Sequence, residues 1–400
     1  MASITAARTG LKRRRAHLRL VRAGERASAR VIAARTDRAV SLVLMSTAAL
    51  TVLGLVMVLS ASSVSAFARY GSSFPFFLRQ LAYAAIGGGA LWLTSRMRHA
   101  AWQRLCLPLL IVSVSLLVLV LIPGVGTVAG GSARWIQLGP VTIQPSEPAK
   151  LAVILFTATL LSKRWARVGD LRQLVVPLAP VMVVVSGLIL LQPDMGTAMI
   201  LVGSVLCLAF AAGARLRHLF AGTAGITVLG FGLVYVEGYR WTRFVSFMDP
   251  WSDPQGSGYQ TIQSLIALAS GGTLGVGLGA SRQKWSYVPN AHTDFIFSII
   301  GEELGLLGSL TVVLLFGMLV YAGIRIALRA PDAFGRLLAA GIVGWFGVQA
   351  LLNLGAVSGL LPITGVPLPL VSFGGSSLVV CLAAVGILVS VGRSGSRSAR

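Results

Sequence analysis

The amino-acid sequence predicts an all-α, polytopic membrane protein with ten transmembrane helices and both termini in the cytoplasm. Of its 400 residues, 55% are hydrophobic and only 12% are charged, whereas a soluble chain carries roughly a quarter charged residues. Ten crossings of about 20 residues each use roughly 200 apolar residues, and 55% of this chain supplies 220. The composition therefore excludes a soluble enzyme, a disordered protein and a secreted disulfide scaffold.

Ten apolar runs of spanning length follow one another, and each is expected to form one transmembrane helix. Because ten is an even number, both termini lie on the same side of the membrane. Residues 39–392 form the membrane domain, between a basic tail at 1–38 and a short tail at 393–400. The approximate limits of the runs are 40–62, 77–95, 105–122, 146–162, 174–191, 195–213, 217–236, 294–323, 337–357 and 372–391.

The distribution of basic residues identifies the cytoplasmic side, because short loops on that side are enriched in Lys and Arg. Both tails and the loops after the second, fourth, sixth and eighth runs hold 26 of the 34 Lys and Arg residues. Four of the 12 acidic residues lie on the same face, which therefore carries 26 − 4 = +22, the whole net charge of the chain. The excess is a topology signal, and we expect no nucleic-acid partner.

The longest outer loop, residues 237–293, contains an amphipathic stretch from Tyr259 to Ala269. Helical spacing of its apolar residues predicts a helix that lies along the membrane surface or packs on the bundle. The glycine-rich segment 271–279 is not a nucleotide-binding loop, because no strand precedes it and it faces outward. We expect a flexible or closely packed segment there.

Ionisable residues inside or at the edge of a span are costly, so each is a candidate functional group. Glu147 and Lys150 are three residues apart at the start of the fourth run, so they share a helix face. They form a structural ion pair or a pair that contacts substrate, and the two roles are not exclusive. Two short strands around Gly139 predict a hairpin that holds Arg134 at the outer interface, where its planar guanidinium could bind phosphate.

Two aspartates lie at the outer ends of predicted helices. Asp194 is in a tight turn, where capping of the sixth helix is the alternative to a role in the site. Asp294 follows His292 and Thr293 at the start of the eighth run, where a cap is again the alternative. An outer carboxylate beside a histidine and several cations indicates a site for a charged substrate at the outer leaflet.

Two further features interrupt the apolar pattern. Glu302 and Glu303 lie about 12 and 13.5 Å beyond Asp294 along the predicted helix, so they must face the bundle interior or a wet cavity. The proline-rich segment 362–369 leads through Ser372 into the tenth run. Irregular backbone at membrane depth is tolerated only where protein or a polar cavity covers it. We therefore expect this segment to lie against other parts of the protein or to line a polar cavity.

Taken together, four groups of these residues resemble the SEDS family of shape, elongation, division and sporulation proteins. They occur in the family's order, and the resemblance extends from about residue 40 to 392. Other motifs, such as Gly301-Glu302-Glu303-Leu304-Gly305, are more similar to the division branch than to the elongation branch. The four groups are Gln144-Pro145-Ser146-Glu147 with Lys150; Gln192-Pro193-Asp194 with Gly196-Thr197; His292-Thr293-Asp294-Phe295-Ile296-Phe297; and Pro367-Leu368-Pro369 with Ser372, Gly374, Gly375 and Ser376.

The resemblance implies a glycosyltransferase that polymerises lipid II into peptidoglycan strands at the outer face of the bacterial cytoplasmic membrane, during septal synthesis. It implies a class B penicillin-binding transpeptidase and other division proteins as partners. The essential aspartate falls on Asp294, which would be the base, a ligand of a divalent cation (Mg²⁺ or Mn²⁺), or both. Expected substrate-binding residues are Arg134, Glu147, Lys150, His292, Thr293 and Ser372, with Asp194, Glu302 and Glu303 as structural or supporting residues.

The chain departs from the family at Asn290, where many relatives carry Glu. If that Glu helps to bind metal in them, Asn290 does not supply the same carboxylate. A lipid II flippase is the main alternative function, because intramembrane charges suit transport as well as catalysis; an elongation-type polymerase and a non-catalytic division scaffold are two others. Transport predicts essential charges throughout the membrane depth, whereas polymerisation predicts that they concentrate at the outer interface.

Overall fold

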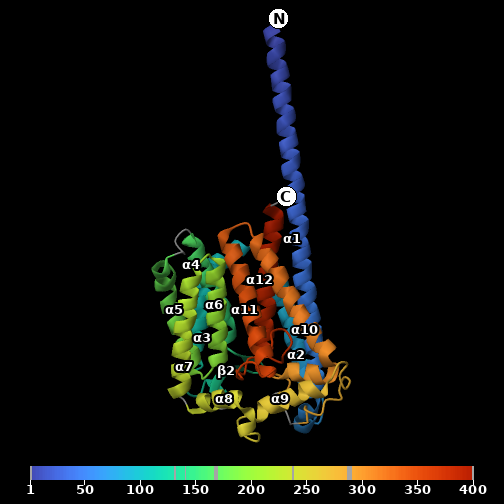
Figure 1. Ribbon diagram of the computed structural model, residues 1–400, viewed down its shortest axis with the longest axis vertical. Helices are drawn as coiled ribbons and strands as arrows, with labels where there is room; N and C mark the ends of the chain where they lie inside the picture. Colours follow the sequence, from blue (N-terminus) through green and yellow to red (C-terminus); the bar gives the residue numbers. More distant parts are fainter. Residues whose placement is uncertain are drawn as a thin grey trace.

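The computed structural model describes residues 2–129, 132–139, 141–165, 170–236, 238–285 and 291–398, which fold mostly into α-helices (Figure 1). The predicted helical class is confirmed, and a small three-stranded sheet is added to it. The elements in chain order are α1 (Ala2–Tyr70), α2 (Pro75–Arg96), α3 (His99–Leu119), β1 (Gly126–Ala129), β2 (Ser132–Leu138), β3 (Val141–Ile143), α4 (Ser146–Lys163), α5 (Leu171–Leu191), α6 (Met195–Ala211), α7 (Leu216–Val236), α8 (Gly238–Met248), the 3₁₀ turn η2 (Pro250–Ser252), α9 (Tyr259–Ser270), α10 (Ile296–Leu328), α11 (Ala333–Val357) and α12 (Gly375–Ser398).

Each of the ten predicted runs coincides with a helix, namely α1 to α7 and α10 to α12. Among the described residues, six helices are long and apolar enough to cross a membrane: α1 from Thr36 onward, α3, α5, α10, α11 and α12. The chain is therefore a multi-pass membrane protein. Helices α4 and α6 are shorter, with 18 and 17 residues, so the count of ten crossings stays a prediction.

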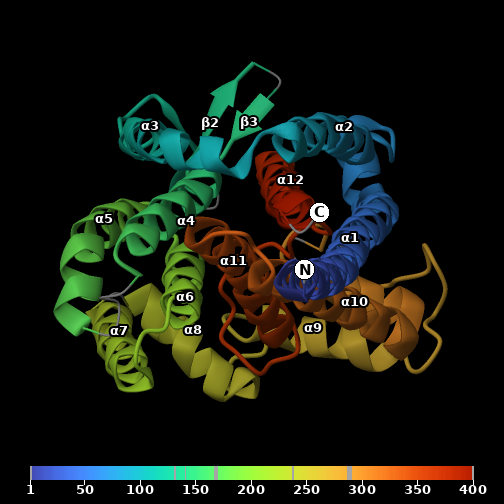
Figure 2. The ribbon, with the colours of Figure 1, turned by 90° about the horizontal axis from the view of Figure 1, so that it is seen from above.

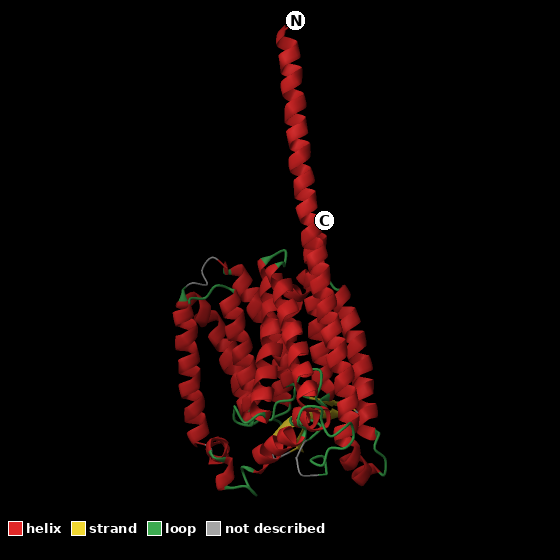
Figure 3. Ribbon diagram, turned by 45° about the vertical axis from the view of Figure 1, so that its right-hand side comes forward, coloured by secondary structure: helices red, strands yellow, loops and turns green. Residues whose placement is uncertain are grey.

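Both termini lie at one end of the helical bundle, and the strands, α8 and α9 lie at the other end (Figure 1). Most of the irregular backbone gathers at this second end (Figure 3). The loop charges predict the same arrangement, with the termini inside and the longest loop outside. We therefore call the two ends the cytoplasmic end and the outer end.

The centre of the bundle is formed by α4, α11 and α12, with the other helices around them (Figure 2). Most residues of these three helices are buried, including the large side chains of Trp345 and Phe346. Lipid is as apolar as these side chains, so close packing rather than exclusion of water holds such helices together. Helices α4 and α11 carry four buried polar residues of the site described below, Glu147, Lys150, Gln349 and Asn353.

The predicted hairpin forms at the outer end. Strand β2 pairs antiparallel with β3 in a register that sets Leu138 opposite Val141. Gly139 turns the chain between them with a φ of 62°, a conformation that glycine adopts without steric cost. Strand β1 pairs with the other edge of β2, so Arg134 lies on the central strand of the sheet.

The structure corrects the prediction of one continuous helix in the eighth run. Helix α10 is interrupted at Gly305, where φ is 65° and ψ is −160°. The glycine-rich segment 271–279 packs into this break: the amide of Leu306 donates to the carbonyl of Gly272 at 2.9 Å, and the amide of Gly277 donates to that of Glu303 at 3.0 Å. The segment is therefore closely packed, and hydrophobicity alone could not reveal the break because both halves of the run are apolar.

Helix α9 is the predicted amphipathic helix of the outer loop, with Ile262 and Ala267 buried and Ile266 exposed. The prediction for Asn290 falls outside the described residues.

Candidate active site

Asp294 lies at the outer end of α10, two residues before the helix begins. Its side chain does not cap the helix, because the cap residue is Phe295 and no side chain there accepts a backbone hydrogen bond. The main-chain carbonyl of Asp294 is fixed by Asn353, whose Nδ2 donates to it at 2.8 Å. The carboxylate lies against Gly365, where an added Cβ would be 3.6 Å from Oδ2. Its carboxylate is thus not used to start the helix.

The surroundings of Asp294 favour its neutral form. Its pKa is raised from 3.8 to about 6, mainly by burial and in smaller part by the negative charge of Asp194. The positive charges of Arg134 and Arg243 act in the opposite direction. Four charged side chains from different parts of the sequence therefore meet at one place near the outer end. A carboxyl group that titrates near neutrality is suited to general base catalysis.

Asp194 caps a helix, which is the structural role considered for it in the sequence. It caps α6 by accepting from the amide of Thr197 at 3.1 Å and from the Thr197 hydroxyl at 2.8 Å. The side-chain amide of Gln144 donates to its second oxygen at 3.3 Å. Its carboxylate is thus fixed by three donors, whereas that of Asp294 is not used as a cap.

Arg134 reaches from β2 to the turn that holds Asp194. Its Nε donates to the carbonyl of Gln192 at 2.9 Å, and Nη2 donates to the carbonyl of Pro193. A guanidinium has five donor hydrogens in a planar fork, so these two contacts leave others for a ligand. The hairpin thus holds Arg134 at the outer end, as predicted, and the structure adds that its positive charge acts on Asp294 and is anchored to the backbone of the turn before Asp194.

Glu147 and Lys150 form a buried ion pair in the first turns of α4, each about 1% exposed. Lys150 Nζ donates to Glu147 Oε1 at 2.9 Å and to Gln349 Oε1 at 3.1 Å. It also lies 4.9 Å from the centre of the Trp345 ring, a favourable position for a cation. Ser377 donates to the other oxygen of Glu147 at 3.0 Å. Of the two alternatives for this pair, the geometry favours the structural ion pair.

Helix α11 connects this ion pair to Asp294. Gln349 and Asn353 are four residues apart, so they lie on one face and one turn from each other. Gln349 Nε2 donates to the carbonyl of Pro367 at 2.8 Å, and Asn353 Nδ2 donates to that of Val366 at 2.7 Å. The segment 362–369 is thus tied to the same face of α11 that binds Lys150 and the backbone of Asp294.

His292 and Ser372 lie beside the site but are engaged in packing and turn formation. The His292 ring packs against those of Phe76 and Phe373 in tilted arrangements, with its centre 4.9 and 5.6 Å from theirs. Burial lowers the pKa of His292 to about 4, so the ring is neutral near pH 7. The Ser372 hydroxyl accepts from the amide of Leu368 at 2.8 Å and closes the turn before α12. Thr293 is half-buried next to Asp294.

Glu302 and Glu303 belong to a different cluster. Glu302 accepts from the hydroxyl of Ser281 and from the amide of Arg282, the latter at 2.9 Å. Glu303 accepts from Ser60 of α1 at 2.7 Å and lies 3.6 Å from Lys284. Both carboxylates are buried, as predicted, and they attach the outer loop and α1 to α10. Their role in the structure is therefore supporting.

A pocket of about 410 Å³ opens in the outer loop beside Arg243. Because Arg243 also acts on Asp294, this pocket adjoins the candidate site. Most of the residues that line it carry a polar side chain. The lining residues are Thr242, Arg243, Gln255, Gly256, Ser257, Tyr259 and Gln260.

Asp294 is the carboxylate that could bind a divalent cation at this site. Among the described residues, no group of three or more His, Cys, Asp or Glu side chains could hold a metal ion. Asp194 already accepts three hydrogen bonds, so Asp294 is the carboxylate left to bind a cation. Mg²⁺ often takes one or two carboxylates and completes its ligands with substrate phosphates and water, and the site is compatible with that arrangement.

Sequence reasoning missed three residues of the site, namely Arg243, Gln349 and Asn353. A signal was present for the last two, because they are polar residues at helical spacing within the apolar run 337–357. No comparable signal marked Arg243, which lies in the outer loop among other polar residues.

Comparison with known proteins places the chain among proteins of cell-wall synthesis. Residues 40–397 match the family described as cell cycle protein, which comprises FtsW, RodA and SpoVE. Stage V sporulation protein E of Bacillus subtilis is 45% identical over 88% of this chain and 96% of its own length. A probable peptidoglycan glycosyltransferase FtsW of Geobacter metallireducens is 42% identical over 87% of this chain and 93% of its own length.

Solved structures show the same fold. A chain from a peptidoglycan synthase complex that coordinates polymerization and crosslinking is 33% identical, with a TM-score of 0.73 over 88% of this chain and 97% of that chain. The rod shape determining protein RodA of Thermus thermophilus is 30% identical, with a TM-score of 0.64 over 88% of this chain and 95% of that chain. The similarity covers all ten of the predicted runs in sequence and the helical bundle in space.

Proposed function

The chain belongs to the FtsW, RodA and SpoVE family of cell cycle proteins, and we propose that it is a peptidoglycan glycosyltransferase that polymerises lipid II. Relatives named peptidoglycan glycosyltransferase FtsW are about 42% identical over nearly their whole length, which supports this activity. The growing glycan strand on its undecaprenyl pyrophosphate is the donor. The sugar 4-hydroxyl of an incoming lipid II is the acceptor.

The proposed step forms one bond and breaks one bond. The 4-hydroxyl oxygen attacks the anomeric carbon of the donor, the bond from that carbon to pyrophosphate oxygen breaks, and the hydroxyl proton moves to a carboxylate. A sugar hydroxyl is a weak nucleophile, so removal of its proton by a positioned base typically contributes about 10²–10⁴-fold to the rate. The leaving pyrophosphate gains negative charge, which fixed positive groups stabilise.

Asp294 is the proposed base. The observation that supports it best is a half-buried carboxylate at the outer end with a pKa raised to about 6, which feels the positive charges of Arg134 and Arg243 and is not used as a helix cap. At pH 7 most of this group is ionised and can accept a proton, and its raised pKa makes the transfer more favourable than for an ordinary aspartate. A second base is not required, because no water molecule has to be activated.

Arg134 and Arg243 are the proposed partners of the pyrophosphate, because both act electrostatically on Asp294. Lys150 is 1% exposed and already paired with Glu147, so we assign it a positioning role through Gln349 and the segment 362–369. A divalent cation on Asp294 would add positive charge beside the pyrophosphate oxygens when bound.

We further propose that synthesis takes place at the outer face of the bacterial cytoplasmic membrane, at the division septum, with ten helices crossing that membrane. The complex that coordinates polymerization and crosslinking supports a class B penicillin-binding transpeptidase as the partner. The sporulation and division relatives are 45% and 42% identical, so identity alone does not separate these two roles. Depletion of the protein in growing cells tests the division role, which predicts filaments without septa.

The decisive assay uses the purified full-length chain with lipid II and Mg²⁺ or Mn²⁺, with and without the transpeptidase. Wild type should make glycan strands, and Asp294→Ala should make none. Asp249→Ala is the matched control, because Asp249 is an exposed aspartate of the outer loop, outside the proposed site. Normal polymer from Asp294→Ala refutes the assignment of the base, and wild-type polymer in excess EDTA refutes the metal.

The flippase alternative makes a different prediction for the same variant. A transporter would move lipid II across vesicle membranes whether or not Asp294 can accept a proton. Flipping that survives Asp294→Ala, together with absence of polymer from wild type, would favour transport.

A further inference from the structure

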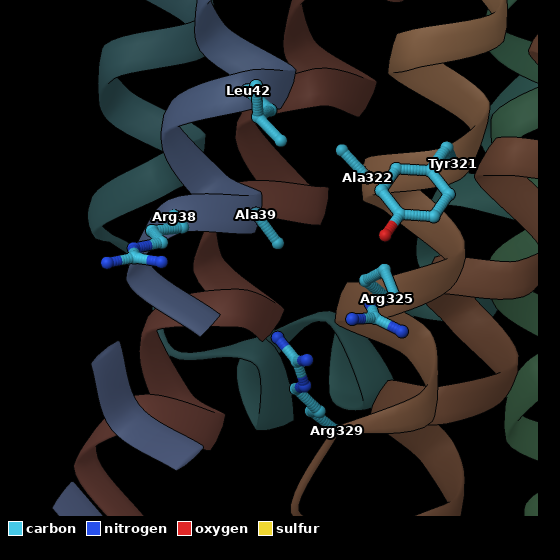
Figure 4. Close-up of a pocket in the computed structure, with 7 residues that line it drawn as sticks. All are labelled: Arg38, Ala39, Leu42, Tyr321, Ala322, Arg325 and Arg329. Carbon is cyan, nitrogen blue, oxygen red and sulfur yellow. The ribbon is translucent and has the colours of Figure 1, made fainter. Parts of the chain in front are cut away.

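A second charged site lies at the cytoplasmic end of the bundle, whereas the active site lies at the outer end. A pocket of about 390 Å³ lies between α1 and α10. Three arginines, Arg38, Arg325 and Arg329, are among the seven residues that line it, and no acidic residue is among them. In Figure 4, Arg329 extends from α10 toward the gap between the helices, Arg325 lies against α10 below Tyr321, and Arg38 extends from the other side of α1 than Ala39 and Leu42.

The rest of the lining is apolar or aromatic. Leu42 and two alanines form the floor, and Tyr321 forms one wall, with the guanidinium of Arg325 5.5 Å from its ring centre. The same two helices carry exposed apolar side chains close in sequence to the lining residues, among them Met45 at 63% and Ile324 at 46%. The pocket therefore joins a strongly cationic rim to a surface that suits acyl chains.

We propose that this pocket binds an anionic phospholipid of the cytoplasmic leaflet, with the phosphate on the arginines and an acyl chain along the groove between α1 and α10. Charge complementarity selects the ligand: three guanidiniums at the cytoplasmic interface match a phosphate, and basic pockets between transmembrane helices on this side bind anionic head groups. Arginine suits phosphate because its planar fork can donate two parallel hydrogen bonds. A soluble anion would use the rim but not the apolar groove.

The site has a consequence for the bundle. Helices α1 and α10 are joined near the outer end by the hydrogen bond from Ser60 to Glu303. A lipid that contacts Arg38 on α1 and Arg325 on α10 would join the same two helices at the cytoplasmic end. Bound lipid should therefore stabilise the pair, and its loss should lower the melting temperature without requiring any change at Asp294.

The test measures lipid binding by native mass spectrometry of the purified full-length chain, with the melting temperature as a second readout. The probes are phosphatidylglycerol and phosphatidylcholine with identical acyl chains, and glycerol 1-phosphate without chains. Wild type should retain phosphatidylglycerol and gain stability from it, and phosphatidylcholine should do neither. Replacing Arg38, Arg325 and Arg329 together by Gln should weaken phosphatidylglycerol binding on the order of a hundredfold.

A matched control removes three positive charges from the same membrane face outside the pocket. Arg98, Arg104 and Arg215 are exposed at the cytoplasmic ends of other helices, and their joint replacement by Gln should leave lipid binding unchanged. Leu42→Trp is the second variant, because it fills the pocket and keeps every charge. It should also abolish binding, even if the triple arginine variant does not fold.

Three results would overturn the proposal. The first is wild-type lipid binding in a folded triple variant, or in Leu42→Trp. The second is an equal loss in the control triple, which would mean that only the total surface charge matters. The third is binding of glycerol 1-phosphate as tight as that of phosphatidylglycerol, which would identify a site for a soluble anion.

Discussion

Replacing Asp294 by Asn should inactivate the enzyme and at the same time make the folded protein more stable. The substitution keeps the size of the side chain and removes its charge. It also leaves the main-chain carbonyl of residue 294 available to Asn353, so the hydrogen bond of 2.8 Å between them is retained. Loss of activity would then report the carboxylate itself, because the position of the segment is unchanged.

The stability change follows from the direction of the pKa shift. The folded protein raises the pKa of Asp294 from 3.8 to about 6, so folding favours the protonated form. Ionisation therefore destabilises the folded state as the pH rises through this window, and the full effect is present above about pH 6. A shift of about two units corresponds to an upper limit of about 3 kcal/mol, which Asp294→Asn would recover at pH 7 to 8 and would not recover at pH 4.

Two measurements on the same preparation check this reasoning. Lipid II polymerisation by wild type should decline as the pH falls through about 6, because a protonated Asp294 cannot accept the hydroxyl proton. Thermal unfolding at pH 4, 5, 6 and 8 should show the Asn variant equal to wild type at the lowest pH and more stable at the highest. A variant that is less stable than wild type at pH 8 would refute the proposed desolvation of the carboxylate.

Three further predictions concern residues that support the site. Lys150→Met and Glu147→Leu should each destabilise the protein by about 3–5 kcal/mol, because each leaves one buried charge without its partner. The double variant should be closer to wild type in its free energy of unfolding. Additive losses in a double-mutant cycle, measured by denaturation, would contradict the ion pair. Gly305→Ala should prevent stable folding, since its φ is 65° and a Cβ would lie 2.3 Å from a backbone nitrogen, whereas Gly88→Ala, with open space around it, should keep the wild-type melting temperature. Asn353→Ala should lower kcat more than it changes KM, because two carbonyls lose their donor at a cost of about 1–3 kcal/mol each; an unchanged kcat would exclude a positioning role.

Much of this fold could be predicted from the sequence, because its main signals are local. Length and composition define a membrane protein, and each of the ten apolar runs coincides with a helix. The hairpin around Gly139 was predicted by two short strands and a turn residue, which lie within a dozen residues of each other. Signals of this kind do not depend on what packs against them.

The parts that could not be predicted depend on contacts between distant segments. The break in α10 exists because the glycine-rich segment donates to the carbonyl of Glu303 and accepts from Leu306, and neither partner is marked by hydrophobicity. Likewise, the spacing of Glu147 and Lys150 showed that they could pair. Only the positions of Gln349 and Trp345 on another helix show that Lys150 is enclosed.

The segment 362–369 shows how these contacts place Asp294. The sequence required it to line something, since irregular backbone at membrane depth must be covered. In the structure its carbonyls accept from Gln349 and Asn353 on one side, and Gly196 at the start of α6 packs against it on the other. The carboxylate of Asp294 lies beside Gly365 of this segment. Because Gln349 also binds Lys150, we expect a disturbance of the buried ion pair to reach Asp294 through this segment.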